Sequence, residues 1–219
     1  MPEKIPVTAA VLAGGRSMRM GVDKTLVQLD GQALVVRVAT AVEEICAQVM
    51  VVTNRPEALA GAGLNASVAV YSDEVPYQGP LGGLVTALAK APQDWVLAVA
   101  VDMPYVSAQV IRALWDARRQ ADMVVPITDR GPEPLPALYS RRCLPRGRQL
   151  LASGCRRLTA LLPGLRVVEY SAEALRRIDP DLESFRNINT PDDLALARKE
   201  TPWPGEPPVA SRQAVRVRS

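Results

Sequence analysis

The residues best suited to chemistry lie in one glycine-rich segment near the N-terminus. Residues 12–24 read LAGGRSMRMGVDK and follow the apolar run 7–12. A glycine pair after a buried strand lets a ligand approach the backbone, whose amides can donate hydrogen bonds to phosphate oxygens. Arg19 and Lys24 add two positive charges to the same loop. The segment therefore predicts a site for a phosphorylated ligand, although it matches neither the P-loop nor the GxGxxG pattern.

Polar side chains follow three further apolar runs: Asn54 after residues 48–53, Asp73 after residues 67–71 and Asp102 after residues 95–101. Helix-like segments separate these runs, and this alternation predicts a mostly parallel sheet covered by helices on both faces. The carboxyl ends of parallel strands meet at one edge, where such sheets bind their ligands. We therefore expect Asp102, whose strand ends shortly before Pro104, to lie beside the glycine-rich loop.

The chain has 219 residues and no histidine. This excludes Ser-His-Asp and Cys-His nucleophilic sites and zinc sites that use imidazole. A metal would have to be held mainly by oxygen ligands, which favours Mg²⁺, and Asp102 is the best candidate for its ligand.

Charge and composition narrow the class of partner. The net charge is +3 and aromatic residues make up 4% of the chain. Neither favours binding to nucleic acid. The apolar run near the N-terminus is too short for a signal peptide or a membrane span. Three widely spaced cysteines are typical of reduced thiols, so we expect a cytoplasmic protein that binds neither nucleic acid nor membrane.

The helical pattern predicts helices over residues 33–47, 81–91 and 107–120, and a helix that begins at Thr190-Pro191. Beyond Arg130 the pattern loosens. We expect a strand at 122–127 before that point, and beyond it short strands at 137–140 and 166–170 and two short helices within 141–162. Residues 201–219 contain four prolines and few large apolar residues, which predicts a disordered tail.

Six segments together resemble the molybdenum cofactor guanylyltransferases, a branch of the Rossmann-like nucleotidyltransferases. They are LAGG-x3-RMG-x-DK at 12–24, VTNR at 52–55, Asp73 with GPLGG at 79–83, VDMPY at 101–105, PLPALY at 134–139 and RNINTP at 186–191. The resemblance extends from about residue 7 to residue 198. The chain departs from the family at Glu133, where His or Gln is common, and an ionised carboxylate donates no hydrogen bond.

The resemblance implies a three-layer Rossmann-like nucleotidyltransferase fold in one domain, residues 1–200. Residues 5–130 would bind the nucleotide and residues 131–200 the acceptor. GMP would pass from GTP to the phosphate of the molybdenum–molybdopterin cofactor, with release of pyrophosphate. Partners could include other cofactor-biosynthesis proteins and apo-molybdoenzymes.

The family's site residues carry over by motif. The expected catalytic residues are Arg19, Lys24 and Asp102, with Mg²⁺ on Asp102. The expected nucleotide-binding residues are Leu12, Ala13, Gly14, Gly15, Lys24, Asn54, Asp73 and Asp102. The expected acceptor-binding residues are Gly79, Gly82, Asn187 and Asn189.

The sequence leaves alternatives open. A related enzyme with another base or acceptor, such as a cytidylyltransferase or a sugar-phosphate enzyme, would share most of these features, and so would a non-catalytic nucleotide-binding module. Asn187 and Asn189 could instead belong to the cap of the helix at Pro191. A basic region could be solvated helix faces, or could attract the acceptor or a partner protein; it comprises Arg141, Arg142, Arg146, Arg148, Arg156 and Arg157.

Overall fold

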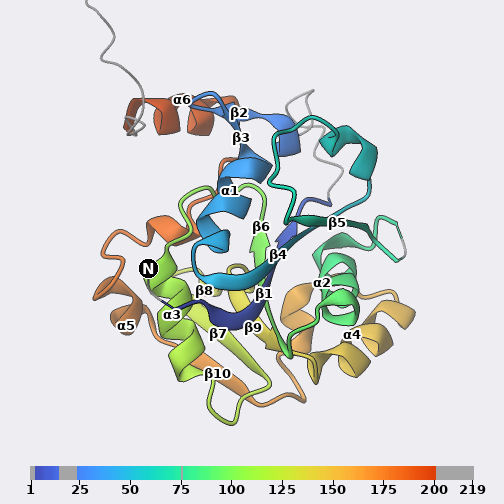
Figure 1. Cartoon of the computed structure of the whole chain (residues 1–219). Helices are drawn as coiled ribbons and strands as arrows, with labels where there is room; N and C mark the ends of the chain where they lie inside the picture. Colours follow the sequence, from blue (N-terminus) through green and yellow to red (C-terminus); the bar gives the residue numbers. More distant parts are fainter. Residues whose placement is uncertain (1–2, 15–23, 75, 201–219) are drawn as a thin grey trace, which may run out of the picture.

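An eight-stranded sheet forms the centre of the molecule (Figure 1). The computed structural model describes residues 3–14, 24–74 and 76–200. The strands are β1 (Ile5–Leu12), β4 (Cys46–Thr53), β5 (Ala69–Ser72), β6 (Trp95–Ala100), β7 (Met123–Thr128), β8 (Gly131–Pro132), β9 (Ala137–Ser140) and β10 (Val167–Tyr170). They are ordered β10-β7-β9-β6-β1-β4-β5, with β8 paired to β7.

Parallel pairing dominates this sheet. β1 pairs in parallel with both β4 and β6, and β4–β5 and β7–β10 are parallel as well. β9 is antiparallel to β6 and β7, and β8 is antiparallel to β7. The expected mostly parallel α/β sheet is therefore confirmed.

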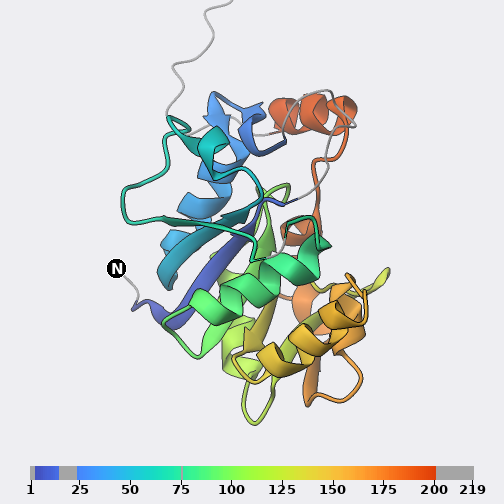
Figure 2. The ribbon, with the colours of Figure 1, turned by 90° about the vertical axis from the view of Figure 1, so that its right-hand side faces the viewer.

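Helices cover both faces of the sheet. Apolar side chains of α1 (Leu34–Glu43) and α3 (Ala108–Ala117) pack in one core cluster, together with residues of α5 (Ala172–Arg176) and α6 (Pro191–Glu200). α2 (Gly79–Lys90) and α4 (Cys143–Ala152) pack in the other cluster, and Figure 2 shows these two helices side by side in front of the sheet. The two clusters on opposite faces of one sheet give the expected three layers.

Short elements complete the fold. They are the hairpin of β2 (Gln28–Leu29) and β3 (Gln32–Ala33) and the 3₁₀ helices η1 (Lys24–Leu26), η2 (Pro56–Leu59), η3 (Leu158–Leu161) and η4 (Glu183–Phe185). None of the helices in the described part of the chain combines the length and apolar character that crossing a bilayer requires.

The sequence-based boundaries were wrong at several points. α1 ends at Glu43, not at residue 47, because the next residues join the sheet: the Ile5 amide donates to the Ile45 carbonyl at 2.8 Å and Ile5 pairs with Cys46. α3 likewise ends three residues before the expected boundary. The second helix expected within 141–162 is the 3₁₀ helix η3, and α5 was missed because it is only 5 residues long.

The β2–β3 hairpin was also missed, although its turn carried a signal. Asp30 and Gly31 both adopt positive φ, at 51° and 78°, as the two central residues of a tight hairpin turn require. An Asp-Gly pair is a frequent choice at these positions.

One ion pair joins the start of β7 to the start of β10. The Asp122 carboxylate accepts from Arg166 Nη2 at 2.9 Å and from the Arg166 backbone amide at 3.0 Å. These bonds lower the pKa of Asp122 from its ordinary 3.8 to about 2, with a smaller contribution from Arg142. Because an unfolded chain keeps the ordinary pKa, ionised Asp122 stabilises the folded state above about pH 4.

We expect Asp122→Asn to lower the free energy of unfolding at pH 7 by about 1–2 kcal/mol, because the charge that Arg166 stabilises is removed. The difference from wild type should shrink as the pH falls from 4 towards 2, where the wild-type carboxylate is protonated as well. Urea unfolding across this pH range measures both effects. The control is Asp94→Asn, at an 88% exposed side chain whose ion pair with Arg141 should contribute little. Equal losses at pH 7 would contradict this account.

Candidate functional site

The carboxyl ends of β1, β4 and β6 form one edge of the sheet. The chain passes from β1 outwards to β4 and β5, and then returns to the other side of β1 as β6. This reversal opens a crevice at the strand ends, where α/β sheets bind ligands. Two backbone bonds hold the edge together: Ala13 N donates to Val52 O at 2.8 Å, and Val101 N donates to Leu12 O at 3.2 Å.

Gly14, Asn54 and Asp73 meet at this edge. A Cβ atom built on Gly14 would lie 3.1 Å from Asn54 Nδ2 and 3.3 Å from Asp73 Oδ2. Any larger side chain at this position would crowd both groups. Thr53 Oγ1 donates to Ala13 O at 3.3 Å and ties the first residue after β1 to the end of β4. The structure thus brings together Gly14, Asn54 and Asp73, which come from three separate motifs of the sequence.

Asp73 is a buried acid. Its side chain lies against the start of α2, where a Cβ atom on Gly83 would be 3.6 Å from Oδ1. Burial raises the pKa of Asp73, and its hydrogen bond with Asn54 partly opposes the shift. Oδ1 is buried and accepts no hydrogen bond from the described residues. A buried acceptor of this kind is suited to a donor group on a bound ligand.

Asn54 also organises the loop that leads into α2. Its Oδ1 accepts from the Tyr77 amide at 3.1 Å, and Tyr77 has a positive φ of 61°. At the start of α2, Gly79 has φ 68°, and a Cβ atom there would meet Arg156 at 3.3 Å. A Cβ atom on Gly82 would approach Gln78 to 2.6 Å. Both glycines therefore allow tight packing of the α2 N-terminus, next to Asp73.

Asp102 lies at the other side of the crevice, two residues after the end of β6, and its side chain is half-buried. Its carbonyl accepts from the Ile188 amide at 2.8 Å. This bond places the segment of Asn187 and Asn189 beside the strand-end carboxylate, although the two regions are far apart in sequence.

Both asparagines line a pocket of about 540 Å³. Asn187 Oδ1 is buried and makes no hydrogen bond with the described residues. Charged side chains of both signs share the lining: Asp129, Arg130, Arg176, Asp181, Glu183, Arg186 and Asp193. Gly79 and Gly82 are not among the lining residues, so the four expected acceptor-binding residues lie at two places, and that role stays a prediction.

The cap of α6 is built from Thr190 and Asp193. The amides of Asn189 and Thr190 donate to Asp193 Oδ2 at 2.9 Å and 2.8 Å, and Asp193 N donates to Thr190 Oγ1 at 3.0 Å. These bonds lower the pKa of Asp193, the Asn189 backbone bond most of all. These cap bonds use the backbone of Asn189. The side chain of Asn187, which lines the pocket, takes no part in them.

Sequence reasoning missed Arg130, which Glu133 positions at the same pocket. Glu133 Oε1 accepts from Thr128 Oγ1 at 2.8 Å and from Arg130 Nε at 2.9 Å. Arg130 Nη2 in turn donates to Phe185 O at 3.0 Å. Glu133, where the family commonly has His or Gln, therefore holds the guanidinium of Arg130 at the pocket. Neither spacing nor motif in the sequence signals this pair.

Several expected residues lie outside the description. Gly15 and Arg19 fall within 15–23, and Lys24 begins η1 with a side chain that is not described. Among the described residues, no group of three or more Asp, Glu, Cys or His side chains could hold a metal ion. A single carboxylate at Asp102 still fits Mg²⁺, which is commonly held by one or two carboxylates plus the phosphates of its substrate.

Comparisons with known proteins agree with this geometry. The family model described as "MobA-like NTP transferase domain" matches residues 9–179. A molybdenum cofactor guanylyltransferase of Desulfosudis oleivorans is 37% identical over 193 residues, which cover 87% of this chain and 94% of that protein. A probable molybdenum cofactor guanylyltransferase of Methanothermobacter thermautotrophicus is 35% identical, with 86% of this chain and 98% of that protein covered.

A crystal structure of molybdopterin-guanine dinucleotide biosynthesis protein A from Archaeoglobus fulgidus has the same fold. It is 31% identical, with a TM-score of 0.77, and the match covers 88% of this chain and 97% of that one. The match extends beyond the nucleotide-binding segments to most of the chain. Sequence, fold and the geometry of the sheet edge agree, and the chain belongs to the MobA-like NTP transferase family.

Proposed function

We propose that this protein transfers GMP from GTP to the phosphate of the molybdenum–molybdopterin cofactor and releases pyrophosphate. The observation that carries the proposal is the bond between Ile188 N and Asp102 O, at 2.8 Å. It sets a carboxylate suited to a metal-bound nucleotide next to a separate polar pocket suited to an acceptor. The names of the relatives support this choice of nucleotide and acceptor.

The nucleotide would lie along the end of β1. Gly14 leaves the backbone open to a ligand, while Asn54 and the buried Asp73 offer amide and carboxylate groups for polar contacts with the nucleoside. Leu12 and Ala13 would form the floor of the nucleotide site next to them. Roles for Gly15, Arg19 and Lys24 in contacting the triphosphate rest on the family motif alone.

The acceptor would enter from the pocket of Asn187 and Asn189. An oxygen of its phosphate attacks the α-phosphorus of GTP, the new P–O bond forms, and the bond to pyrophosphate breaks. No covalent bond to the protein is needed, so catalysis consists of positioning the two phosphates and stabilising their negative charge. Asp102 would hold Mg²⁺, which stabilises charge on the phosphates when bound. Arg130 and Arg186, which are ion-paired with Glu133 and Glu183, would be the cations of this pocket that contact the acceptor phosphate.

We expect Asp102→Asn to reduce GTP-dependent transfer by about 10²-fold or more, the scale of losing one preorganised charge contact. The melting temperature should stay near that of wild type, because the Asp102 backbone bond to Ile188 is retained. Pyrophosphate release in the presence of the pterin acceptor measures the rate. Asp116→Asn, the same change at an exposed site on α3, is the control. Full activity of Asp102→Asn would refute the assigned role.

Replacing Asn187 and Asn189 by Ala should weaken acceptor binding by at least tenfold, since loss of a buried amide contact costs about 1–3 kcal/mol. GTP affinity should change by less than about threefold, because these side chains line the proposed acceptor pocket and not the nucleotide site at the end of β1. Calorimetry with each ligand separates the two effects. The control is Thr190→Ala, which removes a cap bond but keeps both amides. If GTP binding fell as far as acceptor binding at equal stability, the pair would belong to the nucleotide site.

GTP should bind at least tenfold more tightly than ATP or CTP, because a polar site rejects a base that leaves its buried hydrogen-bonding groups unpaired. Titration of each nucleotide in the presence of Mg²⁺ tests this. Equal affinity for CTP would favour the related cytidylyltransferase activity. A nucleotide that binds but releases no pyrophosphate with any acceptor would favour the non-catalytic module.

A further inference from the structure

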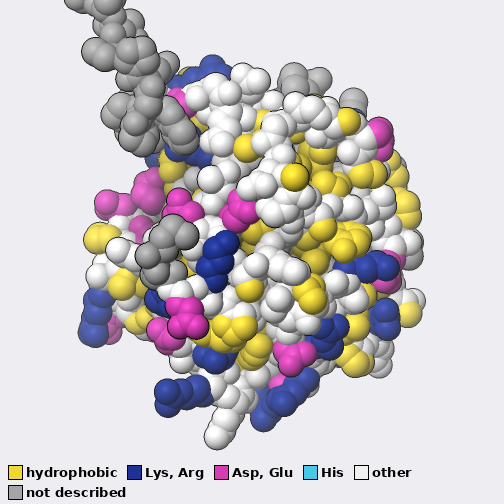
Figure 3. Space-filling view, in the orientation of Figure 1, with side chains coloured by type: hydrophobic (Ala, Val, Ile, Leu, Met, Phe, Trp, Pro, Cys, Tyr) yellow, Lys and Arg dark blue, Asp and Glu magenta, His cyan; other side chains and the backbone are white. Residues whose placement is uncertain are grey.

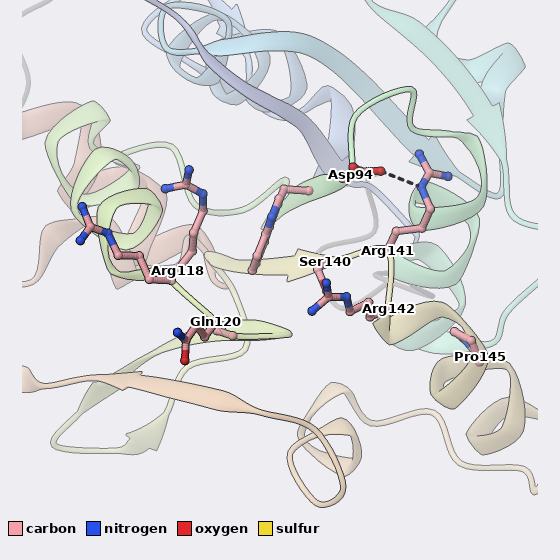
Figure 4. A pocket seen from close by; sticks show the side chains of 10 residues that line it. Asp94, Arg118, Gln120, Ser140, Arg141, Arg142 and Pro145 are labelled. Atoms are coloured by element: carbon pink, nitrogen blue, oxygen red, sulfur yellow. Dashed lines mark ion pairs between the residues drawn. The ribbon is translucent and has the colours of Figure 1, made fainter.

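A second pocket, of about 590 Å³, lies at the amino-terminal edge of the sheet, opposite the candidate site (Figure 4). Trp95 begins β6 and Ser140 ends the antiparallel strand β9, and these two residues pair with each other in the sheet. Both line the pocket, so the paired strand ends mark its position. The turn after α3 and the residues that lead into α4 form the remaining walls.

Positive charge dominates this pocket. Its lining contains four arginines, Arg118, Arg119, Arg141 and Arg142, and one acid, Asp94. In the orientation of Figure 3, basic side chains also gather at the lower end of the molecule, the end at which Figure 1 shows the loop between α3 and β7. An anion is the complementary ligand for such a surface.

Two of the four arginines are held in place by the fold. Arg141 donates to the carbonyls of Leu88, Ala91 and Gln93, at 3.3, 2.6 and 3.0 Å, and so closes the C-terminal end of α2. The Arg118 guanidinium lies 3.3 Å from the centroid of the Trp115 ring and donates to Trp115 O at 2.7 Å. Their charges are therefore fixed at the pocket wall, and that of Arg141 is partly neutralised by its ion pair with Asp94, Nε to Oδ1 at 3.5 Å (Figure 4).

The other two arginines, Arg119 and Arg142, are exposed at the pocket. Arg142 lies 3.5 Å from Asp122, whose shorter bond, of 2.9 Å, is with Arg166. Burial lowers the pKa of Arg118, and the neighbouring charge of Arg119 lowers it further, against the opposing effect of Asp116. Positive charge in this pocket thus exceeds what the nearby acids neutralise.

Two polar features lie in the wall of this pocket. Ser140 is 6% exposed, and its buried Oγ lies beside Cys143, where burial raises the pKa of the thiol and the hydrogen bond with Ser140 lowers it. α4 begins at Cys143 with no side-chain cap and no acidic residue in its first turn, and the nearest carboxylate, that of Asp122, is shared with Arg166 and Arg142. The helix alone would not define a site. The donors available to a ligand come from the exposed guanidinium groups of Arg119 and Arg142.

We propose that this pocket binds the phosphate group of an anionic ligand, at a site separate from the transfer reaction. A phosphate carries two charges near neutral pH and accepts hydrogen bonds on three or more oxygens, which matches the two exposed guanidinium groups of Arg119 and Arg142 in a pocket that Arg118 and Arg141 make more positive. A single carboxylate would occupy only one arginine fork. The indole of Trp95 and the volume of the pocket leave room for a larger organic group beside the phosphate.

The tryptophans provide a local probe. Trp95 lines the pocket, and its ring centroid is 6.3 Å from that of Trp115. Replacing Trp203, which lies outside the described residues, by Phe in every protein leaves fluorescence from these two rings. Inorganic phosphate, pyrophosphate, GMP and glutarate are titrated at constant ionic strength, and each should be compared in wild type and variants.

We expect saturable fluorescence changes with phosphate, pyrophosphate or GMP. Arg119→Gln with Arg142→Gln should raise the half-saturating concentration at least tenfold, the scale of losing charge-assisted hydrogen bonds. The control, Arg148→Gln with Arg177→Gln, removes the same charge at exposed arginines that do not line the pocket. It should change the half-saturating concentration by less than threefold. Pyrophosphate release from GTP should be unchanged in both, so a failure here is distinct from a failure of the proposed function.

The proposal would be overturned by the absence of a saturable change with any phosphate compound, or by equal weakening in both double variants, which would indicate general electrostatics. Glutarate binding as tightly as phosphate would also reject a phosphate site. Tighter binding of GMP than of phosphate would identify the ligand as a nucleotide, and equal binding would identify free phosphate; both support the proposal. If the double variant melts well below wild type, Arg119→Gln alone makes the same test, because Arg142 keeps its contact with Asp122.

Discussion

The parallel pairing of β1 with β4 on one side and β6 on the other is the constraint on which the rest of the structure depends. Val7, Ala9 and Val11 within β1 are completely buried. Because both neighbours run in the same direction as β1, their carboxyl ends must meet at one edge. Gly14, Asn54 and Asp102 are consequently collected at that edge, although the loops that carry them come from separate parts of the chain.

The candidate site contrasts with this apolar centre because it keeps polar groups buried without full pairing. Asp73 and Asn187 each retain a buried oxygen that accepts no hydrogen bond from the described residues. Burying such atoms is unfavourable for folding, at about 1–3 kcal/mol each when no partner is present. Their presence on either side of the Asp102 turn is consistent with a site whose hydrogen bonds are completed by ligands.

The two edges of the sheet carry different kinds of polar side chain. At the carboxyl edge the described groups are carboxylates, amides and glycines, with arginines added by the late segment around Arg130 and Arg186. At the amino edge, arginines surround Trp95 and Ser140. The helices explain part of this asymmetry: α2 directs its N-terminus to the carboxyl edge, while its C-terminal carbonyls are met by Arg141 at the other.

The sequence by itself determined the parallel α/β class, the strand runs and the motif residues of the carboxyl edge, because continuous apolar runs and glycine or acidic strand ends are local signals. Tertiary structure decided the rest. The end of α1 is set by the pairing of Ile5 with Cys46, and the contact of Ile188 with Asp102 joins segments that no local pattern relates. The arginine pocket around Ser140 likewise depends on side chains that meet only after the sheet has formed, since Trp95, Arg118 and Ser140 come from separate parts of the chain. The ion pair of Glu133 with Arg130 is local in sequence, but only the tertiary structure places it at the pocket of Asn187.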